Sequence, residues 1–137
     1  MMNTKVTGSC LCGAITFEYI GEIADAAYCH CTDCRKTTGS AFNISIGLPS
    51  EHFKIHSGTP KGFTKTADSG QQLTRHFCQD CGSPLFTTYP AKPEIVYVKA
   101  GVLNDPTVVR PAYQSWITSS VTWAHIPEKL KAFDKGR

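Results

Sequence analysis

The chain has 137 residues, the size of one ordinary domain, and its 41% hydrophobic and 18% charged residues exclude a disordered protein. The formal charge of +3 is small and scattered, so no basic arm for nucleic acid is expected. No apolar run approaches the roughly 20 residues that span a bilayer, and residues 1–5 lack the apolar core of a secretory signal. We therefore expect a single domain over residues 1–137, located in the cytoplasm, without a nucleic-acid or membrane partner.

Period-two alternation of apolar and polar residues predicts half-buried strands in four segments. In chain order, these segments are 15–19, 42–48, 53–55 and 73–77. The more continuously apolar segment 95–98 predicts a more buried strand. Because turn-forming Gly, Pro, Asn and Asp residues separate the segments, we expect a mainly β fold, a single compact domain of antiparallel packed sheets.

Signals for helices are few. Thr32 can cap one short helical turn that ends at Gly39, and residues 127–133 can form a further turn or two near the C-terminal end. The sequence has no internal repeat and no linker long enough to divide it. Helices are therefore expected only as small additions to the sheets.

The seven cysteines fall into three closely spaced groups. The groups are Cys10 and Cys12, then Cys29, Cys31 and Cys34, then Cys78 and Cys81. In the cytoplasm, clustered cysteines favour metal ligands or catalytic groups over disulfides. Zinc binds four ligands in a tetrahedron, and a catalytic zinc keeps one position open. We therefore predict two Zn²⁺ sites, a closed one with four thiols and an open one with three, whose metal would be the more labile.

Two divisions of the thiols into four and three fit the spacing. The first division joins the pair at 10 and 12 to the pair at 78 and 81, and leaves the central group as the open site. The second joins Cys31 and Cys34 to the pair at 78 and 81, as in a zinc ribbon, and leaves the other three thiols as the open site. Gly13 and Gly82 favour the first division, because a glycine after a ligating turn can adopt positive φ and let backbone N–H groups reach the sulfurs.

The residues after the central group differ from these glycines. Arg35 and Lys36 follow Cys34, and nearby cations favour a thiolate over a thiol. The central group is therefore interpreted as the exposed and reactive one. His30 and His76 are possible fourth ligands, but neighbouring side chains of an extended segment point to opposite faces. Each histidine is therefore expected to lie at the surface or behind the ligands rather than among them.

The cysteine groups and their flanking residues resemble the glutathione-dependent formaldehyde-activating enzyme family. The resemblance rests on segments 10–13, 29–40, 75–86 and 99–106 and on Trp123, in the order that the family shows them. It extends over residues 7–133. The resemblance implies a compact β fold of paired sheets, related to the zinc-containing methionine sulfoxide reductases.

The family resemblance also implies roles for the cysteines. It implies a structural zinc on Cys10, Cys12, Cys78 and Cys81, and a second zinc on Cys29, Cys31 and Cys34. The implied activity is the addition of glutathione to formaldehyde, which gives S-(hydroxymethyl)glutathione and is classed as a carbon–sulfur lyase reaction. Gln114 departs from the histidine found there in many members, which concerns substrate identity rather than a ligand.

Three functions are compatible with these motifs. The leading hypothesis is an enzyme that adds glutathione or another small thiol to formaldehyde or a similar electrophile, with Arg35, Lys36 or Arg75 available to bind a glutathione carboxylate. The alternative is a non-catalytic zinc module for protein interaction or metal buffering. The third is a redox protein in which the central cysteines cycle through a disulfide. Nothing in the sequence indicates a separate general base.

Overall fold

A computed structural model describes residues 4–127 and 129–136. The strands are, in order, β1 Thr4–Ser9, β2 Thr16–Gly21, β3 Ala26–Cys29, β4 Asn43–Pro49, β5 Phe53–Ser57, β6 Lys61–Thr66, β7 Gln72–Phe77, β8 Pro84–Thr88, β9 Ile95–Lys99, β10 Pro111–Ser115 and β11 Lys131–Ala132. The helical elements are α1 Thr32–Thr38 and the 3₁₀ turns η1 Ser50–His52, η2 Ala100–Val102, η3 Pro106–Val108 and η4 Ile117–Ser119. The prediction of a mainly β fold is confirmed.

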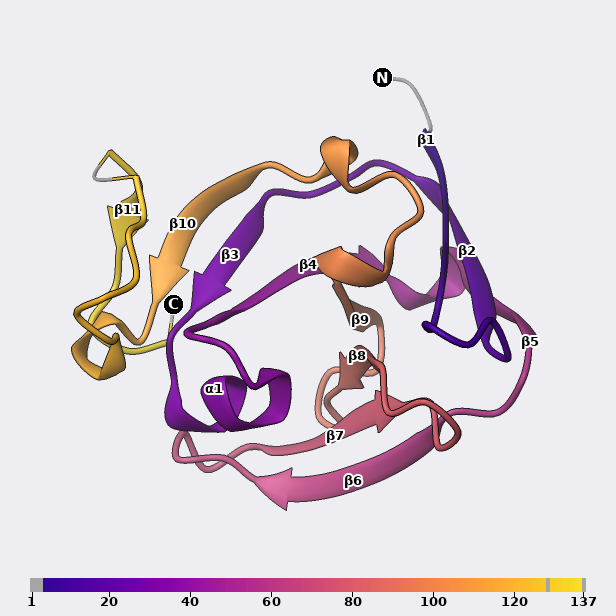
Figure 1. Cartoon of the computed structure of the whole chain (residues 1–137), viewed down its shortest axis with the longest axis horizontal. Coiled ribbons are helices and arrows are strands. Elements are labelled where there is room, and N and C mark those ends of the chain that lie inside the picture. The colour runs from indigo at the N-terminus through magenta and orange to yellow at the C-terminus, as the bar shows by residue number, and fades with distance from the viewer. Residues whose placement is uncertain (1–3, 128, 137) are drawn as a thin grey trace.

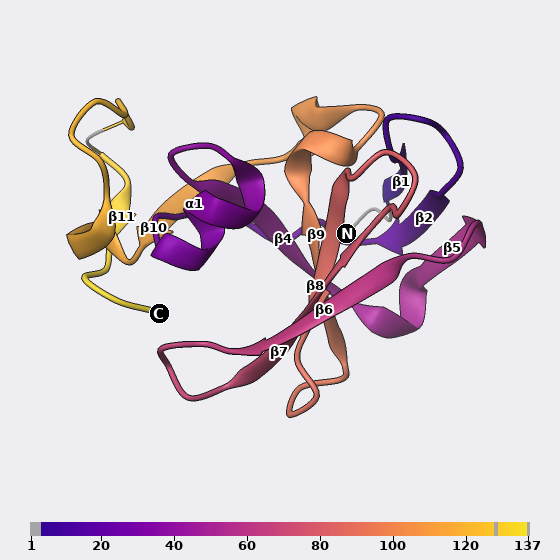
Figure 2. The ribbon, with the colours of Figure 1, turned by 60° about the horizontal axis from the view of Figure 1, so that its bottom comes forward.

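The strands form two sheets (Figures 1 and 2). The smaller has the order β1-β2-β5, and the larger has the order β11-β10-β3-β4-β9-β8-β7-β6. Most neighbours pair antiparallel, as expected, but β10 pairs in parallel with both β3 and β11. This end of the larger sheet is therefore mixed, because β10 returns along β3 after a long connection from β9.

The core lies between the two sheets. Phe17 of β2 packs on Phe53 of β5 with ring centroids 5.4 Å apart, and Phe53 packs on Phe86 of β8 at 5.2 Å. Phe86 is the cross-strand partner of Val98, which is in turn the partner of Ile46. This row of side chains faces the smaller sheet. Because side chains alternate along a strand, the residues directly before and after each member of the row, in its own strand, face away from the core.

All five predicted strand segments form strands, namely β2, β4, β5, β7 and β9. The alternation missed the other strands for local reasons. In β6 every residue is exposed, so no buried face marks it, and β3 has only four residues.

The predicted helix exists, but its cap is one residue earlier than expected. Cys31 is the N-cap of α1, and its sulfur accepts a hydrogen bond from the Cys34 backbone N–H at 3.2 Å. Gly39 ends the helix, as predicted, and the structure shows it in the left-handed conformation.

Of the helical turns expected over 127–133, the structure has a single turn, closed by the hydrogen bond from the Leu130 N–H to the Pro127 carbonyl at 3.3 Å, and no helix among the residues described there. The prediction was wrong beyond this turn, because Lys131–Ala132 pairs with β10 as β11. Glu128 lies outside the described residues.

No helix in the described residues is both long enough and apolar enough to span a membrane.

Candidate functional site

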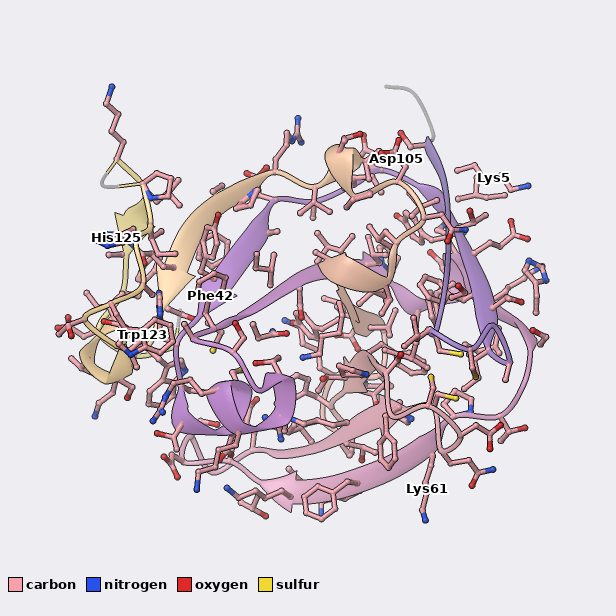
Figure 3. The ribbon with its side chains drawn as sticks, in the orientation of Figure 1. Lys5, Phe42, Lys61, Asp105, Trp123 and His125 are labelled. Atoms are coloured by element: carbon pink, nitrogen blue, oxygen red, sulfur yellow. The ribbon has the colours of Figure 1, made fainter. Side chains whose placement is uncertain are left out.

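Two turns bring four cysteines together. Cys10 and Cys12 lie in the turn from β1 to β2, and Cys78 and Cys81 lie in the turn from β7 to β8. Their four sulfurs lie within 4.8 Å of one another. We call this group the four-cysteine cluster. Figure 3 shows sulfur atoms gathered beside these two turns, on the side of the molecule opposite Trp123.

Backbone and hydroxyl groups hold the four-cysteine cluster in place. Gly13 and Gly82 have φ of 79° and 80°, in the left-handed region that favours glycine. The Ile15 N–H donates to the Cys10 sulfur at 3.3 Å, and the Leu11 N–H donates to the Ser83 hydroxyl at 3.0 Å, which ties one turn to the other. The Ser83 hydroxyl and backbone N–H lower the pKa of the Cys81 thiol to about 5, so this sulfur is readily a thiolate.

The donor set and spacing of this cluster fit zinc. Thiolates at about 2.3 Å from a tetrahedral zinc lie about 3.8 Å from one another. The Cys10 and Cys12 sulfurs are 3.6 Å apart, and the Cys12 and Cys78 sulfurs are 3.7 Å apart. These two sulfur pairs therefore have the spacing that a tetrahedral zinc requires, and all four sulfurs lie within 4.8 Å of one another.

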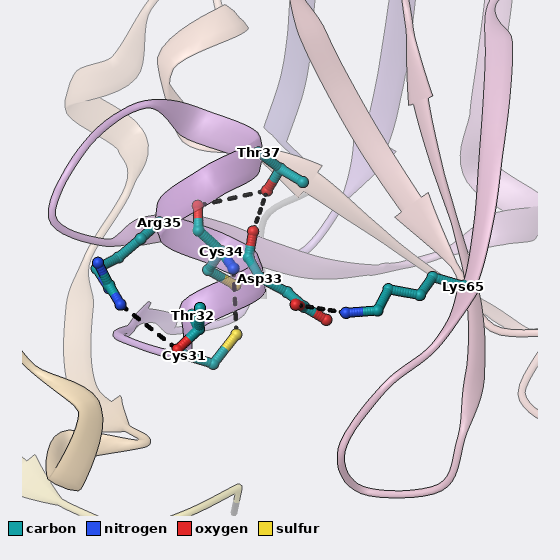
Figure 4. Close-up of polar contacts among 7 residues, drawn as sticks. All are labelled: Cys31, Thr32, Asp33, Cys34, Arg35, Thr37 and Lys65. Carbon is teal, nitrogen blue, oxygen red and sulfur yellow. Dashed lines mark hydrogen bonds and ion pairs between the residues drawn. The ribbon is translucent and has the colours of Figure 1, made fainter.

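The central cysteines form a second group, the three-cysteine cluster. Cys29 ends β3, Cys31 caps α1, and Cys34 lies in the first turn of α1, with the three sulfurs within 4.8 Å of one another. Figure 4 shows the helix start, where the Cys34 N–H bonds to the Cys31 sulfur. The structure thus brings the cysteines together in the first division and not in the second. Their roles as zinc ligands remain a prediction.

The expectation that the central cysteines are the exposed ones was wrong. Cys34 is buried and Cys29 and Cys31 are half-buried, whereas Cys12 of the other cluster is exposed. The reason is that β3 and α1 together enclose the central group, while Cys12 lies at the tip of a surface turn. All three central cysteines nevertheless line a cleft that is open to solvent.

The three thiols of the three-cysteine cluster strongly affect one another's ionisation. Hydrogen bonds from Cys31 and Cys34 lower the pKa of Cys29 to about 2. The pKa of Cys34 is raised, first by its contact with Cys29 and then by Cys31. One negative charge therefore forms easily, and further ionisation is opposed by the charge already present. A bound divalent cation would remove this opposition, so the cluster also fits a metal.

The three-cysteine cluster opens into a cleft of about 450 Å³ on the face of the larger sheet that points away from the core. Strand register explains the lining, because cross-strand partners share a face. One row is Ser115, Cys29 and Asn43, the next is Tyr113, Ala27, Ser45 and Lys99, and the third is Gly47, Tyr97, Thr87 and Arg75. None of the cysteines of the four-cysteine cluster lines this cleft.

The floor of the cleft is cationic. Lys99 is only 8% exposed, and its ammonium donates a hydrogen bond to Asn43 Oδ1 at 2.6 Å. Arg75 is half-buried two strands away. Within the described part of the chain, no carboxylate forms an ion pair with either cation. Burial lowers the pKa of Lys99.

The acidic residues of the cleft lie at its rim, on α1 or on loops. Asp33 of α1 pairs with Lys65 of β6 at 2.7 Å (Figure 4), and Asp25 lies 3.6 Å from Arg110. Asp68, in the turn between β6 and β7, also lines the cleft. The cleft thus presents positive charge at its floor and negative charge at its edge.

The structure separates the three cations proposed for carboxylate binding. Arg75 lines the cleft, but Arg35 and Lys36 do not. Arg35 contacts Thr32 Oγ1 at 3.4 Å, on the other side of the helix start from Asp33 (Figure 4). Sequence reasoning missed Lys99 as a site residue. The available signal was a charged residue at the end of an apolar strand in segment 95–99.

Neither histidine joins a cysteine cluster among the described residues, in agreement with the expectation from strand geometry. His30 is 1% exposed, so it lies behind the ligands rather than at the surface, and its Nε2 lies 2.9 Å from Gln114 Oε1. His76 stacks on Phe86, and its Nε2 lies 2.8 Å from Thr88 Oγ1. Gln114 therefore supports the segment between Cys29 and Cys31.

Comparisons with known proteins agree with these motifs. The family model described as glutathione-dependent formaldehyde-activating enzyme matches residues 5–119. A Halomonas elongata protein provisionally named as such an enzyme is 32% identical over 114 residues, covering 76% of this chain and 68% of that protein. A Fusarium vanettenii protein with the same provisional name is 21% identical over 132 residues, covering 93% and 69%.

The fold also has a solved relative. A crystal structure of a Rhodobacter sphaeroides protein matches with a TM-score of 0.55 at 17% identity, covering 93% of this chain and 98% of that one. This likeness concerns the fold alone. The family model and the Halomonas relative together show that the chain belongs to the glutathione-dependent formaldehyde-activating enzyme family.

Proposed function

We propose that this chain is a zinc-dependent enzyme of the carbon–sulfur lyase class, which adds glutathione to formaldehyde in the cytoplasm. The observation that carries the proposal is the position of the three-cysteine cluster at a cleft with a cationic floor. Family membership supports glutathione and formaldehyde as the reactants. A purely structural metal site would not require a cleft of this kind beside it.

The two clusters suit different metal roles. Cys10, Cys12, Cys78 and Cys81 would hold a structural zinc that ties the two turns together. Cys29, Cys31 and Cys34 would hold a second zinc with one position left for a ligand. When bound there, zinc supplies a soft, electron-rich centre that favours the thiolate of a small thiol.

The residues of the cleft would bind and orient glutathione. Arg75 is half-buried and suited to a bidentate contact with one carboxylate. Asp68 at the rim offers an opposite charge to the glutathione ammonium. Tyr89 and Tyr97 pack edge to face with ring centroids 5.4 Å apart and would exclude water from the reacting end.

The reaction needs only positioning and charge stabilisation. The glutathione sulfur forms a bond to the carbonyl carbon of formaldehyde, and the electron pair of the C=O bond moves to oxygen. That oxygen takes up the proton that the thiol released, which gives S-(hydroxymethyl)glutathione. Holding both reactants in one cleft would account for acceleration over the reaction in water.

Zinc content and exchange kinetics test the proposal together. Reduced, gently purified protein should contain close to two zinc ions per chain, and glutathione should displace or perturb one of them. The protein should also accelerate exchange between ¹³C-formaldehyde and S-(hydroxymethyl)glutathione, measured by NMR. Arg75→Gln should raise the KM for glutathione at least tenfold, and 2-mercaptoethanol, which lacks carboxylates, should react equally well with both proteins.

The contrary result is also clear. The enzyme hypothesis would be rejected if the protein held one zinc per chain, if glutathione did not change that zinc, and if exchange were not accelerated. That result would favour the non-catalytic zinc module.

A further inference from the structure

A buried lysine with no carboxylate partner among the described residues lies beside the three-cysteine cluster. Lys99 is 8% exposed, and its ammonium donates a hydrogen bond to Asn43 Oδ1. Burial lowers the pKa of Lys99, and the negative charge of the neighbouring cluster thiolates acts against that effect. Asn43 is itself 8% exposed, and its amide donates to the Ser45 hydroxyl at 2.8 Å. Burying an ammonium is costly, and no carboxylate among the described residues offsets that cost. Because Lys99 also lines the open cleft, its ammonium is placed to meet a further negative charge that forms on a substrate bound there.

The register of the sheet places this cation at the reacting end of the cleft. Asn43 is the cross-strand partner of Cys29, so the group that holds the Lys99 ammonium lies beside the cluster. Arg75 lies on β7, two strands beyond Lys99, which is roughly 10 Å at the usual strand spacing. The two cations of the floor therefore serve different parts of a ligand.

We propose that Lys99, held by Asn43, is a catalytic residue that binds the anionic oxygen formed when a thiol at the three-cysteine cluster adds to an aldehyde. This inference rests on the proposed function and adds a residue to it. As the C–S bond forms, the C=O electron pair becomes a negative charge on oxygen, within reach of the ammonium. Lys99 stabilises that charge by a charge-assisted hydrogen bond. The proton that completes the hydroxyl is the one that the thiol released, carried by water.

Asn43 has a defined part in this arrangement. A neutral amide oxygen fixes the ammonium without cancelling its charge, whereas a carboxylate at the same place would neutralise it. Asn43→Asp is therefore a sharp test, since it keeps the size of the side chain and leaves Lys99 in place. A merely structural hydrogen bond would tolerate this change, and an anion site would not.

The first experiment measures anion binding and does not depend on catalysis. Formate, a one-carbon anion of the size of the reacting group, is titrated into the zinc-loaded protein by calorimetry. We expect formate to bind the wild type, and both Lys99→Met and Asn43→Asp to weaken binding at least tenfold. The matched control is Lys92→Met, an exposed cation on the rim of the same cleft, which should bind formate as the wild type does.

The second experiment measures catalysis in the same variants. Lys99→Met should lower kcat for S-(hydroxymethyl)glutathione formation at least a hundredfold while leaving glutathione binding within threefold, in contrast to Arg75→Gln. If the wild type binds formate through Lys99 but does not accelerate the reaction, the proposed function fails and the anion site stands.

Three outcomes would overturn the inference itself. The first is formate binding that is absent from the wild type or unchanged in Lys99→Met. The second is an unchanged kcat in Lys99→Met of an active enzyme. The third is loss of zinc from the three-cysteine cluster in Lys99→Met, which would make Lys99 a counter-charge for the metal site. Zinc content and circular dichroism of every variant distinguish this last case.

Discussion

The four-cysteine and three-cysteine clusters use the same side chain in different surroundings. The first is built from two turns that are far apart in the sequence, and its sulfurs are held by backbone N–H groups, Ser83 and two glycines with positive φ. The second is built from one continuous segment, in which a strand end and a helix start supply all three thiols. The first therefore joins parts of the fold, and the second does not.

The two clusters also differ in their relation to the cleft. The three-cysteine cluster is on the outer face of the larger sheet with the cations of the cleft floor, whereas the four-cysteine cluster shares residues with the core, where Cys10 and Cys78 are 2% and 1% exposed. Removing the metal from the four-cysteine cluster should therefore lower stability, whereas removing it from the three-cysteine cluster should lower activity. Four substitutions test that contrast, from the largest expected effect to the smallest.

Cys78→Ala should have the largest effect. It removes one of the four proposed zinc ligands from the cluster that lies between the β1–β2 and β7–β8 turns. Because zinc binding at a structural site contributes directly to folding, the loss should approach the whole net stability of a domain, about 5–15 kcal/mol. Circular dichroism and zinc analysis should show a largely unfolded chain.

Cys31→Ala should leave a folded protein with one zinc and at least a hundredfold less exchange activity. It removes one thiol of the cleft and also the N-cap of α1, whose loss costs about 1 kcal/mol. The melting temperature should therefore fall only slightly. Equal unfolding of Cys31→Ala and Cys78→Ala would contradict the division into a structural and a functional cluster.

Gly82→Ala tests the backbone of the four-cysteine cluster. Gly82 has φ of 80° and open space where an alanine methyl group would lie, so the cost is conformational, about 1–2 kcal/mol. Gly101→Ala is the control, since that position is equally open and its φ is not positive. Chemical unfolding should show the loss in Gly82→Ala only, and zinc should leave this variant faster under a chelator.

Asp33→Asn should have the smallest effect. It breaks the ion pair that joins α1 to β6 at the cleft rim, where the Lys65 side chain is 45% exposed. Exposed pairs contribute about 0–1 kcal/mol, so stability should change by less than 1 kcal/mol and the glutathione KM by less than threefold. A larger loss of activity with unchanged zinc content would show that the rim controls access to the three-cysteine cluster.

Much of the fold was predictable because apolar alternation reports burial directly. Segments 15–19 and 42–48 have one face against the core, and both form strands. Strand β6 has no buried face, and residues 127–133 gave a helical signal, so local patterns misled at both places. Likewise, Arg35 and Lys36 were placed near the thiols by sequence proximity, but neither lines the cleft.

By itself, the sequence determined that this chain has a β fold, three cysteine groups and the motifs of its family, because burial and close ligand spacing are local properties. Only the tertiary structure decided which cysteines meet, how deeply the central ones lie, and which cations face them. Lys99 and Asn43 are 56 positions apart in the chain, yet β4 and β9 pair side by side and bring them together. The physical reason is that register between distant strands fixes the shared face of a sheet, and no single segment contains that information.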